Sequence, residues 1–159
     1  MSTLHHVSMI VNGTRYERDV EARLLLSDFI RHDLGLTGTH VGCEHGLCGA
    51  CTILFDGEPM RSCLMFAVQA NGHEIVTVEA LGTPEAMHPI QQAFVEEHAL
   101  QCGYCTPGFL MSLYAYLKAH PTPDDEEIRE AIDGNICRCT GYENIIKAAK
   151  KASVKMAAR

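Results

Sequence analysis

The stretch Val41-Gly-Cys-Glu-His-Gly-Leu-Cys-Gly-Ala-Cys51 places Cys43, Cys48 and Cys51 in one short loop, and Cys63 follows with eleven residues between. The spacing C-x4-C-x2-C with a later fourth cysteine is typical of a 2Fe-2S cluster site. Three glycines in the loop tolerate the tight backbone that converging thiolates need, and they admit N–H groups to the sulfurs. Structural zinc is the alternative, because Cys48-x-x-Cys51 alone has zinc spacing. The interval of four residues between Cys43 and Cys48, together with a third cysteine in the same loop, favours the iron–sulfur cluster over zinc.

Four further cysteines lie in the second half of the chain, with the spacing C-x2-C, x31, C-x-C: Cys102, Cys105, Cys137 and Cys139. A single residue between two ligands is tighter than the usual zinc knuckle. A thioredoxin-like redox pair is a second alternative, but no βαβ pattern surrounds the C-x2-C. Cys102 and Cys105 precede a predicted helix, whose N-terminus favours anionic thiolates. The four thiols could therefore hold a second 2Fe-2S cluster.

The composition excludes several other classes of protein. Of the 159 residues, 47% are hydrophobic and 21% are charged, as in a soluble chain that builds a core. Thirteen Lys and Arg against 20 Asp and Glu give a net charge of -7, which argues against a nucleic-acid binder. No apolar run is long enough for a transmembrane segment, and the start lacks the features of a secretory signal. We therefore expect a cytoplasmic protein, whose reducing surroundings favour metal binding over disulfides.

The chain changes character near residue 80. Before it, strands are predicted around residues 7–11, 15–20, 51–55 and 74–79, with hairpin turns at Asn12-Gly13 and Asp56-Gly57. A helix is predicted from Leu24 through Ile30 towards Gly35. After it, four helices are predicted: one with Ile90, Phe94 and Val95 on its apolar face, one from an N-cap at Thr106 to His120, one over residues 124–134 and one over residues 143–155. We expect an α+β protein with domains at residues 1–80 and 81–159.

Four segments carry a resemblance to a known family. They begin at Cys43, Arg61, Gln101 and Gly134 and read CEHGLCGAC, RSCL, QCGYCTPG and GNICRCTGY. In this order, with all eight cysteines in register between about Met9 and Lys151, they resemble the small iron–sulfur subunit of the molybdenum hydroxylases, the xanthine oxidase family.

The resemblance implies a fold and a set of cofactor contacts. It implies an N-terminal β-grasp, plant-type ferredoxin-like domain followed by an all-α four-helix-bundle domain. The first would hold a distal 2Fe-2S cluster on Cys43, Cys48, Cys51 and Cys63. The second would hold a proximal cluster on Cys102, Cys105, Cys137 and Cys139. Gln101 and Cys102 would contact molybdopterin of the large subunit, and the distal cluster would face FAD in a medium subunit.

The function implied by the resemblance is electron transfer. The chain would pass electrons one at a time from the molybdopterin site through two 2Fe-2S clusters to FAD, as the iron–sulfur subunit of a molybdopterin-dependent oxidoreductase. It has no dinucleotide fingerprint or P-loop, and its nine histidines form no paired spacing, so they are predicted to be surface or packing residues with no catalytic role. From its start at Met1 and its end at Arg159 we expect a separate subunit of a heterotrimer or of a dimer of heterotrimers.

The substrate and the rival functions rest on weaker signals. The loop from Glu44 to Leu47 differs from that of carbon monoxide dehydrogenases, which favours an aldehyde or an N-heteroaromatic substrate. A free-standing ferredoxin-type electron carrier is the alternative function, although it would not need the helical half. A zinc-stapled interaction module is a further alternative.

Overall fold

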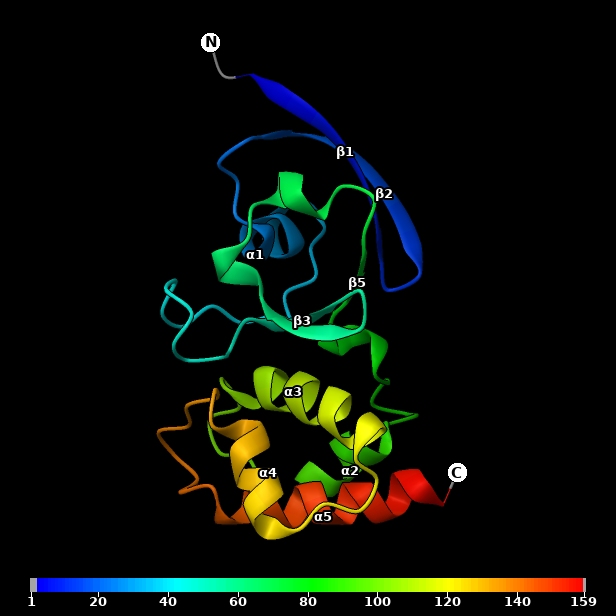
Figure 1. The fold of residues 1–159 in the computed structure, drawn as a ribbon, viewed down its shortest axis with the longest axis vertical. Coiled ribbons are helices and arrows are strands. Elements are labelled where there is room, and N and C mark those ends of the chain that lie inside the picture. The colour runs from blue at the N-terminus through cyan, green and yellow to red at the C-terminus, as the bar shows by residue number, and fades with distance from the viewer. Residues whose placement is uncertain (1–2, 159) are drawn as a thin grey trace.

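A computed structural model describes residues 3–158, in which strands come first and helices second (Figure 1). We refer to residues 4–80 as the sheet half and to residues 89–157 as the helical half. The two halves lie one above the other, and α3 (Thr106–Ala119) lies directly against β3 (Thr52–Phe55) at their junction (Figure 1). The start of β1 and the end of α5 lie at opposite ends of the molecule (Figure 1). No helix within residues 3–158 is both long enough and apolar enough to cross a membrane.

The first hairpin forms as predicted. β1 (Leu4–Val11) pairs with β2 (Thr14–Glu21) in antiparallel register. Between them, Asn12 and Gly13 have φ values of 51° and 76°, and this left-handed geometry matches the twist of paired strands. Alternate residues of β1 are buried, so one face of the hairpin contributes to the core.

The remaining strands complete a mixed five-stranded sheet with the order β2-β1-β5-β3-β4. β3 and β4 (Glu58–Arg61) form the second predicted hairpin, and β5 (Glu74–Val76) is parallel to β1 and antiparallel to β3. One helical segment packs on this sheet, formed by α1 (Leu26–Asp28) and the π-helix η1 (Phe29–Asp33). Its buried apolar side chains are Leu26, Phe29 and Ile30. Two 3-10 turns, η2 (Ser62–Leu64) and η3 (Ala67–Ala70), lie between β4 and β5 in the sequence.

The strand predicted over residues 74–79 is shorter in the structure. It ends at Val76, and residues Val78–Ala80 form the 3-10 turn η4. The side chain of Asn12 replaces the next strand partner: its Oδ1 accepts from the Thr77 N–H at 2.8 Å, and its Nδ2 donates to Thr77 Oγ1 at 2.8 Å. Val78 then packs against the core of the helical half, so the chain leaves the sheet before the end of the predicted strand.

The helical half contains the four predicted helices: α2 (Pro89–Glu96), α3, α4 (Asp125–Ile132) and α5 (Glu143–Ala157). Its core is formed by apolar side chains from all four. α4 starts with a capping box, in which Asp124 Oδ1 accepts from the Glu126 and Glu127 N–H groups at 2.9 Å. On the face of α5 that meets α2, Lys151 Nζ lies 2.9 Å from Glu96 Oε2.

Two details of the helix predictions are wrong. Val95 is 53% exposed, whereas Ile90 and Phe94 are buried, because the buried stripe of the short α2 follows positions i, i+3 and i+4 and Val95 lies one residue beyond it. Thr106 is the first residue of α3 and not its N-cap. Cys105 takes the N-cap position instead, which brings its thiol to the helix N-terminus.

Candidate metal centres

The loop before β3 brings three cysteines into one turn. Glu44, Gly46 and Gly49 all have positive φ, of 57°, 82° and 73°, so the chain folds back on itself repeatedly between Cys43 and Cys51. Gly49 must also be small, because a Cβ there would lie 2.5 Å from the carbonyl oxygen of Gly134 in the helical half. The loop is therefore shaped by its own turns and by contact with the other half.

The four thiols of the sheet half form two pairs. The thiols of Cys43 and Cys48 lie close enough to shift each other's pKa, and the neighbouring thiol of Cys51 helps burial to raise the pKa of Cys63. Cys51 and Cys63 are buried, whereas Cys43 and Cys48 are partly exposed. The backbone N–H of Cys48 also donates to Cys43 Sγ at 3.4 Å. This centre thus has an inner buried pair and an outer pair that solvent reaches.

The helical half repeats the arrangement. Cys139 Sγ lies 3.6 Å from Cys102 Sγ, and the neighbouring thiol of Cys137 helps burial to raise the pKa of Cys105. Cys102 and Cys139 are exposed, while Cys137 is buried and Cys105 partly so. All eight thiols are free. The structure places them in four neighbouring pairs, two within each of the two predicted groups.

Hydrogen bonds and burial shift the pKa values of these thiols in opposite directions. The backbone N–H of Cys48 lowers the pKa of Cys43 to about 6. Burial raises the pKa of Cys63 and that of Cys105 to about 12. Neighbouring thiolates repel each other. The remaining thiols of each site therefore lose their protons readily only if a cation binds between the sulfurs. The donor set therefore suits a metal centre.

The pairwise arrangement of the thiols matches one kind of metal centre. Among residues 3–158, no three or more His, Cys, Asp or Glu side chains converge on a point where they could hold one metal ion. A structural zinc site needs four ligands around a single ion. In a 2Fe-2S cluster, two thiolates bind each of two irons, and the pairs observed here match that division. Both sites therefore suit a binuclear cluster.

Backbone contacts join the two centres across the junction. The N–H of Ile136, next to Cys137, donates to the carbonyl oxygen of Cys48 at 2.9 Å. The side chain of Asn135 donates to the carbonyl oxygen of Gly49 at 3.1 Å. Residues adjacent to a cysteine of one half are thus bonded directly to residues of the other half. The loop of residues 43–51 and the loop between α4 and α5 lie on the same side of the molecule (Figure 1).

A reciprocal contact between His40 and Tyr104 reinforces this junction. Their rings stack with centroids 4.8 Å apart, and His40 Nδ1 lies 2.8 Å from the Tyr104 carbonyl oxygen. The Tyr104 hydroxyl donates to the carbonyl oxygen of Val41 at 2.6 Å. His40 is therefore a packing residue as predicted, but its packing ties the loop before Cys43 to the loop that carries Cys105. No sequence signal pairs two residues that lie 64 positions apart.

The exposed thiol pair of the helical half lies beside Gln101. This side chain is exposed, and its Nε2 donates to the carbonyl oxygen of Cys139 at 3.1 Å. Gln101 thus links the two segments that carry Cys102 and Cys139. Its predicted contact with molybdopterin stays a prediction. Within the sheet half, His45 Nδ1 is hydrogen bonded to the Cys43 carbonyl oxygen and not to a sulfur.

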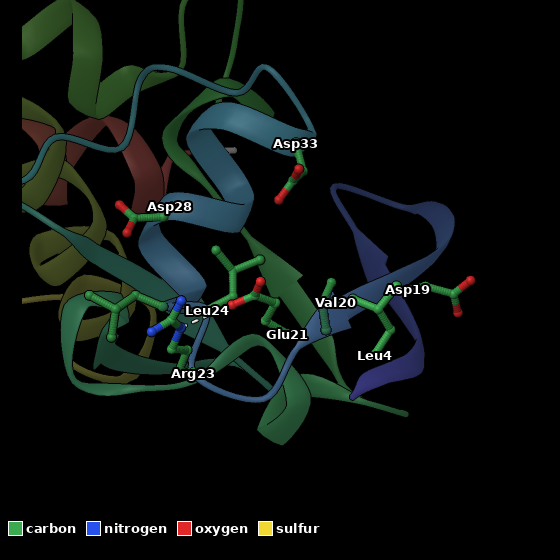
Figure 2. Close-up of a pocket in the computed structure, with 9 residues that line it drawn as sticks. Leu4, Asp19, Val20, Glu21, Arg23, Leu24, Asp28 and Asp33 are labelled. Carbon is green, nitrogen blue, oxygen red and sulfur yellow. Dashed lines mark hydrogen bonds and ion pairs between the residues drawn. The ribbon is translucent and has the colours of Figure 1, made fainter. Parts of the chain in front are cut away.

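A pocket of about 400 Å³ in the sheet half lies apart from these centres (Figure 2). Its walls include the acidic side chains Asp19, Asp28 and Asp33, and Glu21 forms an ion pair with Arg23 at 2.9 Å. No cysteine lines it, and no candidate site residue from the sequence analysis lies in it. The pocket therefore contributes no ligand to either metal centre.

Comparison with known proteins agrees with the two centres. Residues 9–75 match the family model of the 2Fe-2S iron-sulfur cluster binding domain, and residues 77–150 match that of the 2Fe-2S binding domain. Caffeine dehydrogenase subunit gamma of Pseudomonas sp. (strain CBB1) is 62% identical over 152 residues, with 94% of this chain and 91% of the relative covered. Nicotine 6-hydroxylase small subunit of Paenarthrobacter nicotinovorans is 53% identical, with 92% and 88% covered.

A further relative and a solved structure extend the comparison. Aldehyde oxidoreductase iron-sulfur-binding subunit PaoA of Escherichia coli (strain K12) is 43% identical, with 92% of this chain and 71% of the relative covered. The crystal structure of quinoline 2-oxidoreductase from Pseudomonas putida 86 matches with a TM-score of 0.94 and 50% identity, covering 99% of this chain and 98% of that chain. The chain belongs to the small 2Fe-2S iron–sulfur subunits of the molybdenum hydroxylase (xanthine oxidase) family.

Proposed function

We propose that this chain carries electrons one at a time from a molybdopterin site in a large subunit to FAD in a medium subunit. Hydroxylation of a substrate RH with water yields ROH, two protons and two electrons. FAD takes up two electrons and two protons, so the balance closes, and the chain needs to carry only the electrons. The observation that supports this role most directly is the presence of two centres, each built from two thiol pairs, on either side of one junction.

The ligands follow from the pairs. We assign the cluster of the sheet half to Cys43 with Cys48 on one iron and Cys51 with Cys63 on the other. We assign the cluster of the helical half to Cys102 with Cys139 and Cys105 with Cys137. When bound, each 2Fe-2S cluster accepts and releases one electron at a time. The protein residues hold the sulfurs, exclude water from the inner pairs and donate hydrogen bonds that favour the more negative state.

The exposed thiol pairs indicate the direction of electron transfer through the subunit. The outer pair of the helical half, Cys102 and Cys139, is exposed beside Gln101, and we assign this edge to the molybdopterin of the large subunit. The outer pair of the sheet half, Cys43 and Cys48, is the corresponding edge for FAD. Between the edges, the hydrogen bond from Ile136 to the Cys48 carbonyl oxygen gives a short bonded connection through the junction.

The finer architecture and assembly belong to the same proposal. We infer a β-grasp ferredoxin-like domain over residues 1–80 and a four-helix bundle over residues 81–159, because each half has its own core. We further propose a cytoplasmic heterotrimer with the large and medium subunits, which could assemble as a dimer of heterotrimers.

An N-heteroaromatic ring is the substrate class that we favour for the complex. The relatives named for caffeine and nicotine are 62% and 53% identical to this chain, compared with 43% for the aldehyde oxidoreductase subunit. An aldehyde is the second substrate class. The chemistry itself would take place on the large subunit, since this chain contributes thiol ligands and electron transfer only.

Iron analysis and co-purification test the proposal. The purified complex should contain about four iron atoms and about four acid-labile sulfides per copy of this chain, and its reduced form should show two distinct electron paramagnetic resonance signals. A tagged chain should also retain a molybdopterin subunit and an FAD subunit through purification. A chain that remains a monomer and reduces many unrelated partners would support the free ferredoxin instead. A chain that holds zinc and no iron would refute both.

A further inference from the structure

The hydrogen bonds that reach the cysteine sulfurs differ between the two centres. In the sheet half, the donors to Cys43, apart from its paired thiol, are backbone N–H groups. In the helical half, Cys137 Sγ accepts from the N–H groups of Cys139 and Thr140 at 3.4 Å and 3.3 Å, and from the Thr140 hydroxyl at 3.1 Å. Within residues 3–158, this is the one side-chain hydroxyl that donates to a cysteine sulfur. It is therefore a donor that a point mutation can remove without altering the backbone.

The surroundings of Thr140 aim its hydroxyl hydrogen at the sulfur. The backbone N–H of Tyr142 donates to Thr140 Oγ1 at 3.2 Å, so the oxygen is engaged as an acceptor there and its own hydrogen is directed to Cys137 Sγ. Tyr142 is held in turn: its hydroxyl accepts from the Cys137 N–H at 2.9 Å, and its ring packs edge-on against Phe109 with centroids 6.1 Å apart. The three residues form a closed circuit of hydrogen bonds. The donor is thus in place before any electron arrives.

We propose that Thr140 sets the reduction potential of the helical-half cluster by donating its hydroxyl to Cys137. This inference rests on the proposed function, in which Cys137 is a cluster ligand. Reduction adds one negative charge to the cluster, part of which lies on the ligand sulfurs. A hydrogen bond to a charged acceptor is stronger than one to a neutral acceptor, so the fixed hydroxyl stabilises the reduced form more than the oxidised form. Thr140 therefore makes this cluster easier to reduce.

The experiment compares three variants in the purified holo-complex. Thr140→Val removes the hydroxyl and keeps the shape of the side chain, Thr140→Ser restores the hydroxyl, and Thr122→Val makes the same change at an exposed site that lines another pocket. The midpoint potential of each cluster is measured by redox titration with electron paramagnetic resonance detection. For Thr140→Val we expect about a tenfold fall in the ratio of reduced to oxidised helical-half cluster at a fixed potential, which corresponds to about 59 mV for one electron.

The controls define what each result means. The sheet-half cluster should keep its potential in all three variants, and Thr140→Ser and Thr122→Val should keep the wild-type potential of both clusters. An unchanged midpoint in Thr140→Val, with both clusters present, would overturn the inference. A fourth variant, Thr140→Ala, is added if Thr140→Val lacks the helical-half cluster. Loss of that cluster in both Thr140→Val and Thr140→Ala would overturn the inference too, because Thr140 would then be needed for assembly. Failure of the proposed function itself looks different, since the wild-type complex would then lack the second signal and half of the iron.

Discussion

Gly108 lies in α3 where that helix crosses the cysteine loop, and replacing it with alanine brings two opposing effects into competition. Helix propensity alone predicts that Gly108→Ala stabilises the protein by about 1 kcal/mol, because glycine inside a helix loses more backbone entropy than alanine. The structure predicts the opposite sign. A Cβ at Gly108 would overlap the carbonyl oxygen of Gly49 and lie 3.0 Å from Ala50 Cα.

The steric effect should dominate. Both opposing atoms belong to the backbone of the loop, so no flexible side chain can move aside. Overpacking of this kind costs about 3 kcal/mol at the upper end of its usual range, which leaves a net loss of about 2 kcal/mol. For a chain of this size, 1 kcal/mol corresponds to roughly 2–4 °C, so the unfolding midpoint should fall by roughly 4–8 °C.

Two assays check this prediction. Scanning calorimetry of wild-type and Gly108→Ala holo-protein at one scan rate measures the midpoint, with Gly72→Ala as the control. Gly72, unlike Gly108, has a positive φ, of 85°, and open space around its Cβ position, so that variant should lose about 1 kcal/mol to backbone strain alone. The magnetic interaction between the two reduced clusters should weaken only in Gly108→Ala, because α3 must move away from the loop. A rise in the midpoint of Gly108→Ala would refute the reasoning.

Three further changes give separable outcomes. Cys139→Ser should lower the iron content from about four to about two per chain and remove the helical-half resonance while the sheet-half signal persists, and retention of both signals would contradict our ligand assignment. Tyr104→Phe deletes the hydrogen bond to the Val41 carbonyl oxygen, so it should cost about 1 kcal/mol in chemical denaturation and leave the iron content unchanged; an unaltered denaturation midpoint would argue against the junction contact. Asp124→Ala removes the cap of α4 and should cost about 1 kcal/mol, with both resonances unchanged, whereas Asp124→Asn should restore most of that stability.

The sequence by itself determined the local features of this protein. The hairpin turns at Asn12-Gly13 and Asp56-Gly57 were predictable because a type of turn depends on the φ values that a few residues allow. The acidic start of α4 was predictable because capping involves neighbours in the chain. The proximity of Cys43, Cys48 and Cys51 followed from their spacing, since three ligands within one loop are necessarily close. In each of these cases the interacting groups lie within a few residues of one another.

Only the tertiary structure decided features that join distant segments. It shortened the strand at Val76, because Asn12 binds Thr77 from 65 residues away. It divided the eight thiols into four pairs and placed Ile136 on the Cys48 carbonyl oxygen. The contact of His40 with Tyr104 also depends on how the two halves meet. Such contacts arise when whole helices and strands pack together and their polar groups find hydrogen-bond partners in distant segments. A linear pattern of residue types does not specify which distant segments meet.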